Sequence, residues 1–561
     1  MPVLAQVDLR LDAGPLDYTL LAVYFVFVLG IGFMARRSVS SSLDFLLSGR
    51  SLPAWVTGLA FISANLGAIE LLGMAANGAQ YGMATVHYYW IGAIPAMVFL
   101  GLVMMPFYYG SKVRSVPEFL RRRFGKGAHL VNAISFAVAQ VLIAGVNLYA
   151  LAFLLNLMLG WPIPLSVVIA AAIVLTYTAL GGLSAAIYNE VLQFFVIVAA
   201  LLPLTIVGLH KVGGWDGLVE KVTGGPGGAE QLSAWPATEL TGIQNPVLSV
   251  IGIVFGLGFV LSFGYWTTNF AEVQRALSAK SMSAARRTPI IGAYPKMLIP
   301  FVIIIPGIIA ALVVPEMVAL KAGEESGGVV YNNALPALIG ELLPNGMLGI
   351  AITGLLASFM AGVAANVSSF NTVFTYDLWQ DYVKKDRPDE YYLRIGRLAT
   401  IGGTVVAIGT AFLAAGYGNI MDYIQALFSF FNAPLFATFI LAMFWKRMSA
   451  AAGWAGLVAG TLGAVAVFVL AETGVLDLPG QGASFVGAGV AFAVDIVVSV
   501  VVTTFTRPVP EERLVGLVYS LTPREDRRHS TTGDDAGWYR SPLLLGIGVL
   551  VLTAVLNIIF G

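Results

Sequence analysis

The 561-residue sequence contains no cysteine, which excludes disulfide bonds and metal sites built from thiolates. Charged residues are also scarce, at 11%, and 31 basic side chains balance 31 acidic ones. With no net charge and no basic arm, nothing indicates a nucleic-acid partner. The four histidines, at positions 87, 129, 210 and 529, are scattered and show no metal-ligand spacing. We therefore expect no transition metal, no cofactor and no enzymatic activity.

Apolar residues, in contrast, make up 58% of the chain. Runs of about 20 apolar residues are long enough to cross a bilayer, and the chain contains about fourteen of them. The predicted spans are 16–35, 54–80, 85–108, 130–157, 162–180, 187–208, 246–272, 289–314, 345–375, 396–416, 419–445, 452–472, 484–506 and 541–560. We predict an all-α integral membrane protein without a soluble domain, and we expect its first span to be a retained helix rather than a signal peptide.

Lysine and arginine are distributed unevenly over the predicted loops. If the loop with Arg36, Arg37 and Arg50 is cytoplasmic, 26 of the 31 basic residues lie inside, four lie outside and one, Lys296, lies within the membrane. Cytoplasmic loops of membrane proteins are enriched in lysine and arginine. We therefore predict a multi-pass protein of the cell membrane with both termini outside. The lipid bilayer is its expected environment, and no obligatory protein partner is evident.

Lys296 is a basic residue inside the apolar run 289–314. A lysine near the bilayer centre costs about 2.5–3.5 kcal/mol on insertion scales, so it normally faces a partner or a water-filled cavity. Pro295, Pro300 and Pro306 surround it, and irregular backbone at membrane depth is tolerated where it lines a cavity. We interpret Lys296 as a pocket residue of a transporter. The alternative is a lysine that snorkels to the membrane interface.

Two predicted spans have the composition of interrupted helices. The first, 58–78, contains Asn65 and Glu70 among its glycines, and the second, 252–269, contains four glycines and Ser262. Helices interrupted at corresponding positions of two halves indicate a binding site at the interface of inverted repeats. Close helix packing through small residues is the alternative. The polar side chains favour a site.

Seven segments of the chain resemble the sodium/solute symporter family, particularly its bacterial sodium–sugar branch of sodium/galactose and sodium/glucose cotransporter-like proteins. They are FLLSGRSLPAW (45–55), ANLGAIELLGM (64–74), VPEFLRRRF (116–124), YTALGGLSAAIYNEVLQ (177–193), NFAEVQRALSAKSMSAA (269–285), FNTVFTYDLWQDYV (370–383) and FWKR (444–447). One such segment would be weak evidence, whereas seven in the family's order, on the expected sides of the membrane, are strong evidence. The resemblance covers about residues 43–456.

The resemblance implies a LeuT-like core of two inverted five-helix repeats with broken first helices. The first repeat would cover 54–208 and the second 246–446. A leading helix at 16–35 and additional C-terminal helices at 450–561 would complete a single transporter domain over 1–561. The resemblance also implies alternating access, in which a central solute site opens to one side of the membrane at a time.

Several residues fall on pocket positions of the sugar-transporting relatives. Lys296 corresponds to their pocket lysine, Tyr265 to the tyrosine that closes the inner side of the sugar, and Gln425 to the glutamine of the last repeat helix. Without the resemblance, the alternative for Tyr265 is an aromatic residue of the core or of an interface, and Gln425 and Asn269 could equally be interhelical hydrogen-bonding groups. The remaining residues that match pocket or near-pocket positions are Asn65, Trp266 and Asn269.

Other pocket positions depart from the sugar pattern. Glu70 stands where relatives carry Gln or His, Tyr89 where they carry a sugar-binding Glu, and Ser262 where they carry Asn. A carboxylate suits a sugar or polyol because it accepts hydrogen bonds from hydroxyls. It could equally pair with Lys296 in the empty pocket or bind an amine, and it argues against a simple anionic solute. We expect import of a small polar solute, a sugar or polyol. An amino acid or carboxylate as solute, or a sensor without transport, are the alternatives.

The predicted sodium site lacks part of its ligand set. In relatives, two carbonyls of the first broken helix act together with a carbonyl and two adjacent hydroxyls of the eighth core helix. Aligned without a gap, this chain offers the carbonyls of Ser63 and Leu66, with Ser358 at the further carbonyl position. Ala361 and Gly362 stand where the hydroxyl pair belongs, so two ligands are missing.

Acidity is kept near this site, because Glu190 stands where relatives carry an aspartate close to the sodium exit path. Three modes of coupling are compatible with these residues. Sodium could bind with a poorer ligand shell, a proton on Glu70 or Glu190 could drive transport, or the protein could be an uncoupled uniporter. We expect sodium as the coupling ion, with the other two modes as alternatives.

Overall fold

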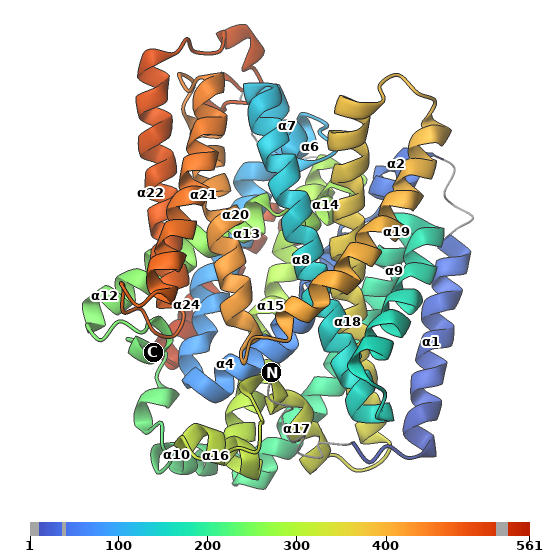
Figure 1. Cartoon of the computed structure of the whole chain (residues 1–561), viewed down its shortest axis with the longest axis vertical. Helices are drawn as coiled ribbons and strands as arrows, with labels where there is room; N and C mark the ends of the chain where they lie inside the picture. Colours follow the sequence, from blue (N-terminus) through green and yellow to red (C-terminus); the bar gives the residue numbers. More distant parts are fainter. Residues whose placement is uncertain (1–10, 36–40, 523–536) are drawn as a thin grey trace.

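The computed structural model describes residues 11–35, 41–522 and 537–561, and these form an almost entirely helical bundle (Figure 1). Among the described residues, twelve helices are long and apolar enough to cross a membrane, and a pair bent by 58° makes a thirteenth crossing. The shorter apolar helix Ile163–Thr176 corresponds to the remaining predicted span. The all-helical membrane fold is therefore confirmed, and the number fourteen depends on how this short helix is counted.

The predicted spans correspond to the following elements. They are α1 (Pro15–Ala35), the bent pair from α3 (Ala54–Asn65) to η4 (Gly82–Val86), the span Tyr88–Gly110, α8 (Lys126–Leu159), α9 (Ile163–Val212), the span Pro246–Thr268, α15 (Met282–Val313), α18 (Met347–Thr372) with η10 (Val373–Val383), α19 (Asp389–Ala414), α20 (Ile420–Phe444), α21 (Ala450–Glu472), α22 (Gly482–Phe505) and α24 (Pro542–Ile559).

Short helices lie at the two ends of the bundle. In the upper half of Figure 1 are α2 (Ser42–Leu47), α6 (Met105–Gly110), α7 (Val116–Phe124) and α14 (Phe270–Leu277). At the lower end are α10 (Gly214–Thr223), α16 (Pro315–Ala322) and α17 (Ala334–Leu342).

The loops predicted to lie inside meet one another in the structure. The backbone N–H of Lys280 donates to the carbonyl of Leu52 at 2.8 Å, joining two of these loops. In the other half of the molecule, Ala234 N donates to Phe560 O at 3.3 Å, next to the C-terminus marked in the lower half of Figure 1. Arg36, Arg37 and the part of the loop 507–540 from 523 to 536 lie outside the described residues.

The first predicted interruption is present. α3 ends at Asn65, Leu66 has a non-helical ψ of 51°, and a π-helical segment, η3 (Ile69–Gly73), follows before α4 (Met74–Tyr81). A Cβ on Gly67 would lie 2.4 Å from Oδ1 of Asn147 on α8, so the close approach of α8 requires a glycine here. Asn147 Oδ1 accepts a hydrogen bond from Ala68 N at 2.7 Å, which satisfies a backbone donor released by the break.

The second interruption lies at the last residue of the predicted segment 252–269. The segment runs from α12 (Pro246–Ile251) through the π-helical η8 (Gly252–Ser262) to α13 (Phe263–Thr268) without a break, and the non-helical residue is Asn269, with ψ 112°. The glycines permit close packing instead. A Cβ on Gly264 would lie 2.8 Å from the carbonyl oxygen of Asn432. Amino-acid composition could not distinguish an interrupted helix from close helix packing, because both require small residues.

The GGLSA segment bends α9. Gly182 has φ 57° and ψ −148°, a combination that essentially only glycine adopts. A Cβ at this position would also lie 2.5 Å from the carbonyl oxygen of Phe45. The kink at Gly182 divides the 50 residues of α9 into two helices, which correspond to the predicted spans 162–180 and 187–208.

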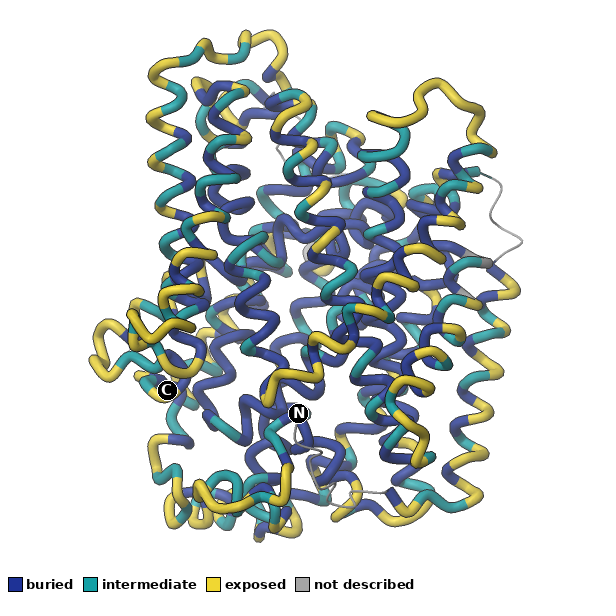
Figure 2. The backbone as a smooth tube through the Cα atoms, in the orientation of Figure 1, coloured by how far each residue is buried: buried dark blue, intermediate teal, exposed yellow. Residues whose placement is uncertain are grey.

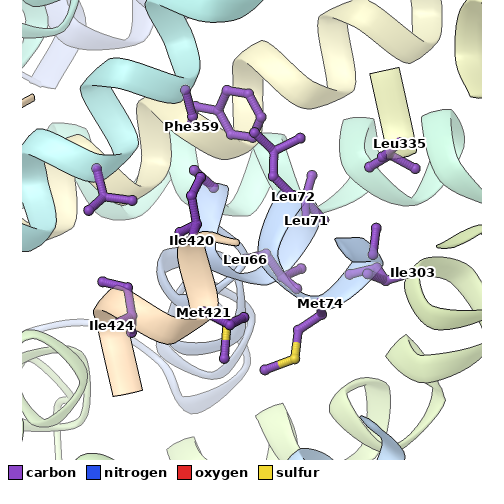
Figure 3. Close-up of a cluster of buried hydrophobic side chains, with 14 of the residues drawn as sticks. Leu66, Leu71, Leu72, Met74, Ile303, Leu335, Phe359, Ile420, Met421 and Ile424 are labelled. Atoms are coloured by element: carbon purple, nitrogen blue, oxygen red, sulfur yellow. The ribbon is translucent and has the colours of Figure 1, made fainter. Parts of the chain in front are cut away.

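Buried residues fill the interior of the bundle, whereas its outer helices carry many exposed side chains (Figure 2). Phe505 and Ile558 are 84% and 81% exposed, as expected for side chains that face lipid. The bend of the first span is embedded in the interior. The buried cluster around it contains Leu66, Leu71, Leu72, Met74, Phe359 and Met421 (Figure 3).

Candidate functional site

A cavity lies at the break of the first span. Its walls come from the broken span, the following π-helical segment η5 (Tyr88–Ala93), the span Pro246–Thr268, α8, α14, α15, α18 and α20. The predicted pocket residues that line it are Asn65, Glu70, Tyr89, Ser262, Tyr265, Trp266, Lys296 and Gln425. Residues that are far apart in the sequence are therefore brought together in one place.

Lys296 forms the centre of the polar part of the cavity. It is 2% exposed, and its Nζ donates to Oε1 of Glu70 at 2.5 Å and also to Oδ1 of Asn65. The ammonium lies 4.9 Å from the ring centre of Tyr89 and 5.3 Å from that of Trp266, distances suited to cation–π attraction. Lys296 therefore does not snorkel to an interface. Its charge is compensated within the cavity.

Tyr265 lies at the end of the cavity nearest α14. Its hydroxyl donates to Oε1 of Glu272 at 2.8 Å and accepts from Nδ2 of Asn65 at 3.0 Å. Its ring lies 4.7 Å from that of Phe428 and 5.3 Å from that of Trp266. The hydroxyl thus connects the broken first span to the beginning of α14.

Glu272 is a cavity residue that the sequence analysis missed. It follows the capping residue Asn269 by three positions in α14, a spacing typical of a capping box at a helix start. Instead of serving the cap, its side chain lines the cavity and accepts from Tyr265. Burial raises the pKa of Glu272 to about 7. The helical pattern of α14 gave no signal that this carboxyl faces the cavity.

The other predicted pocket residues have different surroundings. Gln425 is 4% exposed and lines the cavity, and its amide makes no hydrogen bond to another described residue. Asn269 lies outside the lining. Its Oδ1 accepts from Ala271 N at 2.9 Å and from Gln140 Nε2 at 3.4 Å, so it caps α14 and joins it to α8.

An amide network that the sequence analysis did not predict lies toward the other end of the bundle. Oδ1 of Asn77, on α4, accepts from Nδ2 of Asn419 at 2.9 Å and from Nε2 of Gln481 at 3.1 Å. The hydroxyl of Tyr88, a residue that lines the cavity, donates to Oε1 of Gln481. The network joins the broken span to the beginnings of α20 and α22. Its members are too far apart in sequence to form a motif.

The candidate cation site is occupied by contacts within the protein. The hydroxyl of Ser358 donates to the carbonyl of Leu66, and the carbonyl of Ser63 accepts from Leu66 N at 3.0 Å. A Cβ on Gly362 would lie 2.2 Å from Oδ1 of Asn147. The amide of Asn147 therefore fills the space between the broken span and α18, and Ala361 beside it is fully buried and offers no side-chain oxygen.

Glu190 is also engaged within the protein. Glu190 and Arg275 are both fully buried, and Nε of Arg275 donates to Oε2 of Glu190 at 3.2 Å while Nη2 donates to Oε1. Both carboxylate oxygens accept from the guanidinium, a geometry that Arg–carboxylate pairs favour. Glu190 is absent from the residues that line the cavity. The structure thus places it in a buried ion pair between α9 and α14.

The histidines, which look scattered in the sequence, include one member of a buried cluster. Nε2 of His129 lies 2.9 Å from Oδ1 of Asp377 and 3.8 Å from Oδ2 of Asp381, and Nδ1 lies 2.9 Å from the hydroxyl of Tyr382. Arg121 forms an ion pair with Asp381, one of the carboxylates that would have to bind a metal ion at this cluster. The expectation of scattered histidines is corrected here, because folding joins residues about 250 positions apart.

Comparison with known proteins places this geometry in context. The model of the family described as "Sodium:solute symporter family" matches residues 45–460. Sodium/glucose cotransporter 4 of Danio rerio is 30% identical over 555 residues, which cover 93% of this chain and 84% of that protein. The sodium/glucose cotransporter of Vibrio parahaemolyticus is 28% identical over 462 residues, which cover 79% and 83%.

A solved structure shows the same fold. The substrate-bound, outward-open structure of a Na⁺-coupled sialic acid symporter superposes with a TM-score of 0.72 at 20% identity, over 89% of this chain and 99% of that one.

Proposed function

The chain belongs to the sodium:solute symporter family, and on this premise we propose that it imports a sugar or polyol by alternating access, coupled to sodium. The observation that carries the proposal is the ion pair of Lys296 with Glu70 at the break of the first span. Within the pair neither charge is left over to attract an ionic solute, but the oxygens of Glu70 can still accept hydrogen bonds from hydroxyl groups.

The rest of the cavity suits a polyhydroxylated solute. The free amide of Gln425 offers two donors and an acceptor, and Ser262 adds a hydroxyl. Trp266 and Phe428 supply apolar faces against which the C–H faces of a sugar ring can pack. A few polar groups among aromatic side chains are typical of small-molecule sites. The relatives named sodium/glucose cotransporters support the same class of solute.

We propose that sodium binds weakly. The names of the relatives support sodium as the coupling ion, but the candidate ligands include no hydroxyl pair, and the oxygen of Leu66 already accepts from Ser358. The predicted repeats, 54–208 and 246–446, would be the two halves that move against each other. We also retain the proposal that both termini lie outside.

Uptake by proteoliposomes tests this proposal. Radiolabelled sugars, polyols and amino acids are offered with and without an inward sodium gradient at fixed pH. Accumulation of a sugar or polyol that rises with sodium supports the proposal. Accumulation of amino acids alone would contradict the solute class, and binding without flux would indicate a sensor.

A second mode of coupling is favoured by one specific observation. Two carboxyl groups, Glu70 and Glu272, line the cavity, whereas Lys296 is the one lysine or arginine in its lining among the described residues. A group able to take up a proton is therefore present beside the solute site. Uptake measured against pH at fixed sodium distinguishes proton from sodium coupling.

A further inference from the structure

Glu272 has an unusual place for a carboxyl group. It is 2% exposed and lines the cavity at the first turn of α14. Oε1 accepts from the hydroxyl of Tyr265 at 2.8 Å, whereas Oε2 is buried and has no hydrogen-bond partner among the residues that the structure describes. A buried ionised carboxylate needs donors on both oxygens, and leaving one oxygen unbonded is far more costly for the charged form than for the neutral acid.

The charged groups that face Glu272 do not neutralise it. They are Arg275, Lys296 and Glu190. Arg275 is bonded to both oxygens of Glu190, and Lys296 donates to Glu70 and Asn65. Each of the two cations therefore already has a carboxylate of its own. Three carboxyl groups and two cations leave one negative charge uncompensated if Glu272 is ionised.

The remaining neighbours of α14 supply no counter-charge either. α3 and α18, which pack against α14, contain no titratable residue. Tyr108 and Tyr109 of α6 donate their hydroxyls to the carbonyls of Thr267 and Ala279. The geometry thus fits a neutral carboxylic acid at position 272.

We propose that Glu272 is a proton-binding site of the inner gate, protonated while Tyr265 seals the cavity and ionised when Tyr265 moves away. On opening, the O–H bond of the carboxyl breaks, its electron pair stays on the carboxylate, and the proton passes to water that enters from the cytoplasmic side. Resealing takes a proton back from water. This inference rests on the proposed function, because it assumes that Tyr265 moves to let a solute pass.

The direction of the pH effect follows from proton linkage. The pKa of Glu272 is raised by burial from 4.5 to about 7 in the sealed form, and hydration returns it toward the ordinary value in the open form. Between these two values the sealed form binds more protons than the open form. Raising the pH from about 4.5 to about 7 therefore favours opening, and above pH 7 no further gain is expected.

Solute exchange at equal concentrations on both sides of proteoliposomes tests the inference, because it needs no ion gradient and no fixed orientation. The pH is varied equally on both sides from 5 to 8 at constant sodium. We expect the exchange rate of the wild type to rise from pH 5 to 7.5, by up to about sixtyfold if the pKa of Glu272 returns fully to 4.5 in the open form. In Glu272→Gln, the side-chain amide keeps an oxygen that can accept from Tyr265, but the amide cannot ionise. The exchange rate of this variant should therefore not change with pH.

Glu511→Gln is the matched control, because Glu511 pairs with Lys446 at the protein surface, far from the cavity lining, and should keep the wild-type profile. Glu272→Gln with the same pH profile as the wild type would overturn the inference.

A second measurement does not depend on transport. Infrared spectra of the wild type minus those of Glu272→Gln should show, at pH 5, the C=O band of a buried carboxylic acid that disappears as the pH rises through about 7, whereas bands of other buried carboxyls such as Asp495 are present in both proteins and cancel. Absence of that band from the wild-type-minus-variant spectrum at pH 5 would overturn the inference even if solute exchange is observed. Failure of every solute to exchange would count against the proposed function, and the infrared band would still decide the protonation of Glu272.

Discussion

The side-chain amide of Asn147 occupies the space that a side chain at position 362 would need. A Cβ on Gly362 would lie 2.2 Å from its Oδ1, and the same oxygen accepts the N–H of Ala68 at 2.7 Å. Where α18 lacks the hydroxyl pair, the side-chain amide of Asn147 on α8 fills the space beside the break of the first span. The broken span is linked to its neighbours by hydrogen bonds of the protein itself.

This relationship predicts the outcome of restoring a hydroxyl. Gly362→Ser should lower stability by about 1–3 kcal/mol, because the new side chain overlaps Asn147 in a filled interior. The double variant Gly362→Ser, Asn147→Ala removes the overlap but also the acceptor of Ala68 N–H, so it should recover only part of the thermal midpoint, and its uptake should depend more steeply on sodium than that of the wild type. Midpoints in detergent and sodium activation curves measure both effects. Equal midpoints for Gly362→Ser and the wild type would contradict the contact.

Variants of the Lys296–Glu70 pair can distinguish a role of these residues in stability from a role in transport. Lys296→Met leaves Glu70 buried without its cation, which typically destabilises by about 3–5 kcal/mol. Adding Glu70→Gln removes that charge and should restore the thermal midpoint without restoring uptake. Lys446→Met, at a surface ion pair, is the control and should behave as wild type. Normal uptake by the double variant would show that neither Lys296 nor Glu70 is needed to bind the solute.

The hydroxyl of Tyr265 should contribute to retention of the solute. Tyr265→Phe keeps the ring contact with Phe428 but loses the hydrogen bonds to Glu272 and Asn65. Loss of about 1 kcal/mol should speed efflux about fivefold. Tyr294→Phe is a matched control, since that hydroxyl donates to Leu545 O away from the cavity. The measurement is the rate of solute efflux from preloaded proteoliposomes. Equal efflux rates in the wild type, Tyr265→Phe and Tyr294→Phe would exclude a gate at Tyr265.

Gln425 should act on affinity for the solute. Gln425→Ala removes an amide without an internal partner among the described residues, so stability should change little. The half-saturating solute concentration should rise about five- to tenfold with little change in maximal rate, as expected when one hydrogen bond made throughout the cycle is lost. Gln380→Ala, at the Arg114 contact, serves as control. A lowered maximal rate at unchanged affinity would assign Gln425 to a conformational step instead.

Site residues could be predicted from the sequence where a polar or charged side chain stands within an apolar membrane span. Lys296 stands out because a lysine in an apolar run must find a partner, and Asn65 and Glu70 stand out for the same reason. Glu272 gave no such signal, because a glutamate in the first turn of a short polar helix is ordinary. The glycines of 252–269 suggested an interruption that lies at Asn269, since small residues serve packing and unwinding alike.

The sequence by itself determined the approximate number and limits of the spans, the buried lysine and the family, because hydrophobic length and local motifs are properties of consecutive residues. The tertiary structure alone decided which groups meet. Asn147 reaches Gly362, His129 reaches Asp377, and Glu272 reaches Tyr265 only after the helices pack. The charge balance of the cavity and the filling of the cation site depend on these contacts, and no periodicity within one segment encodes them.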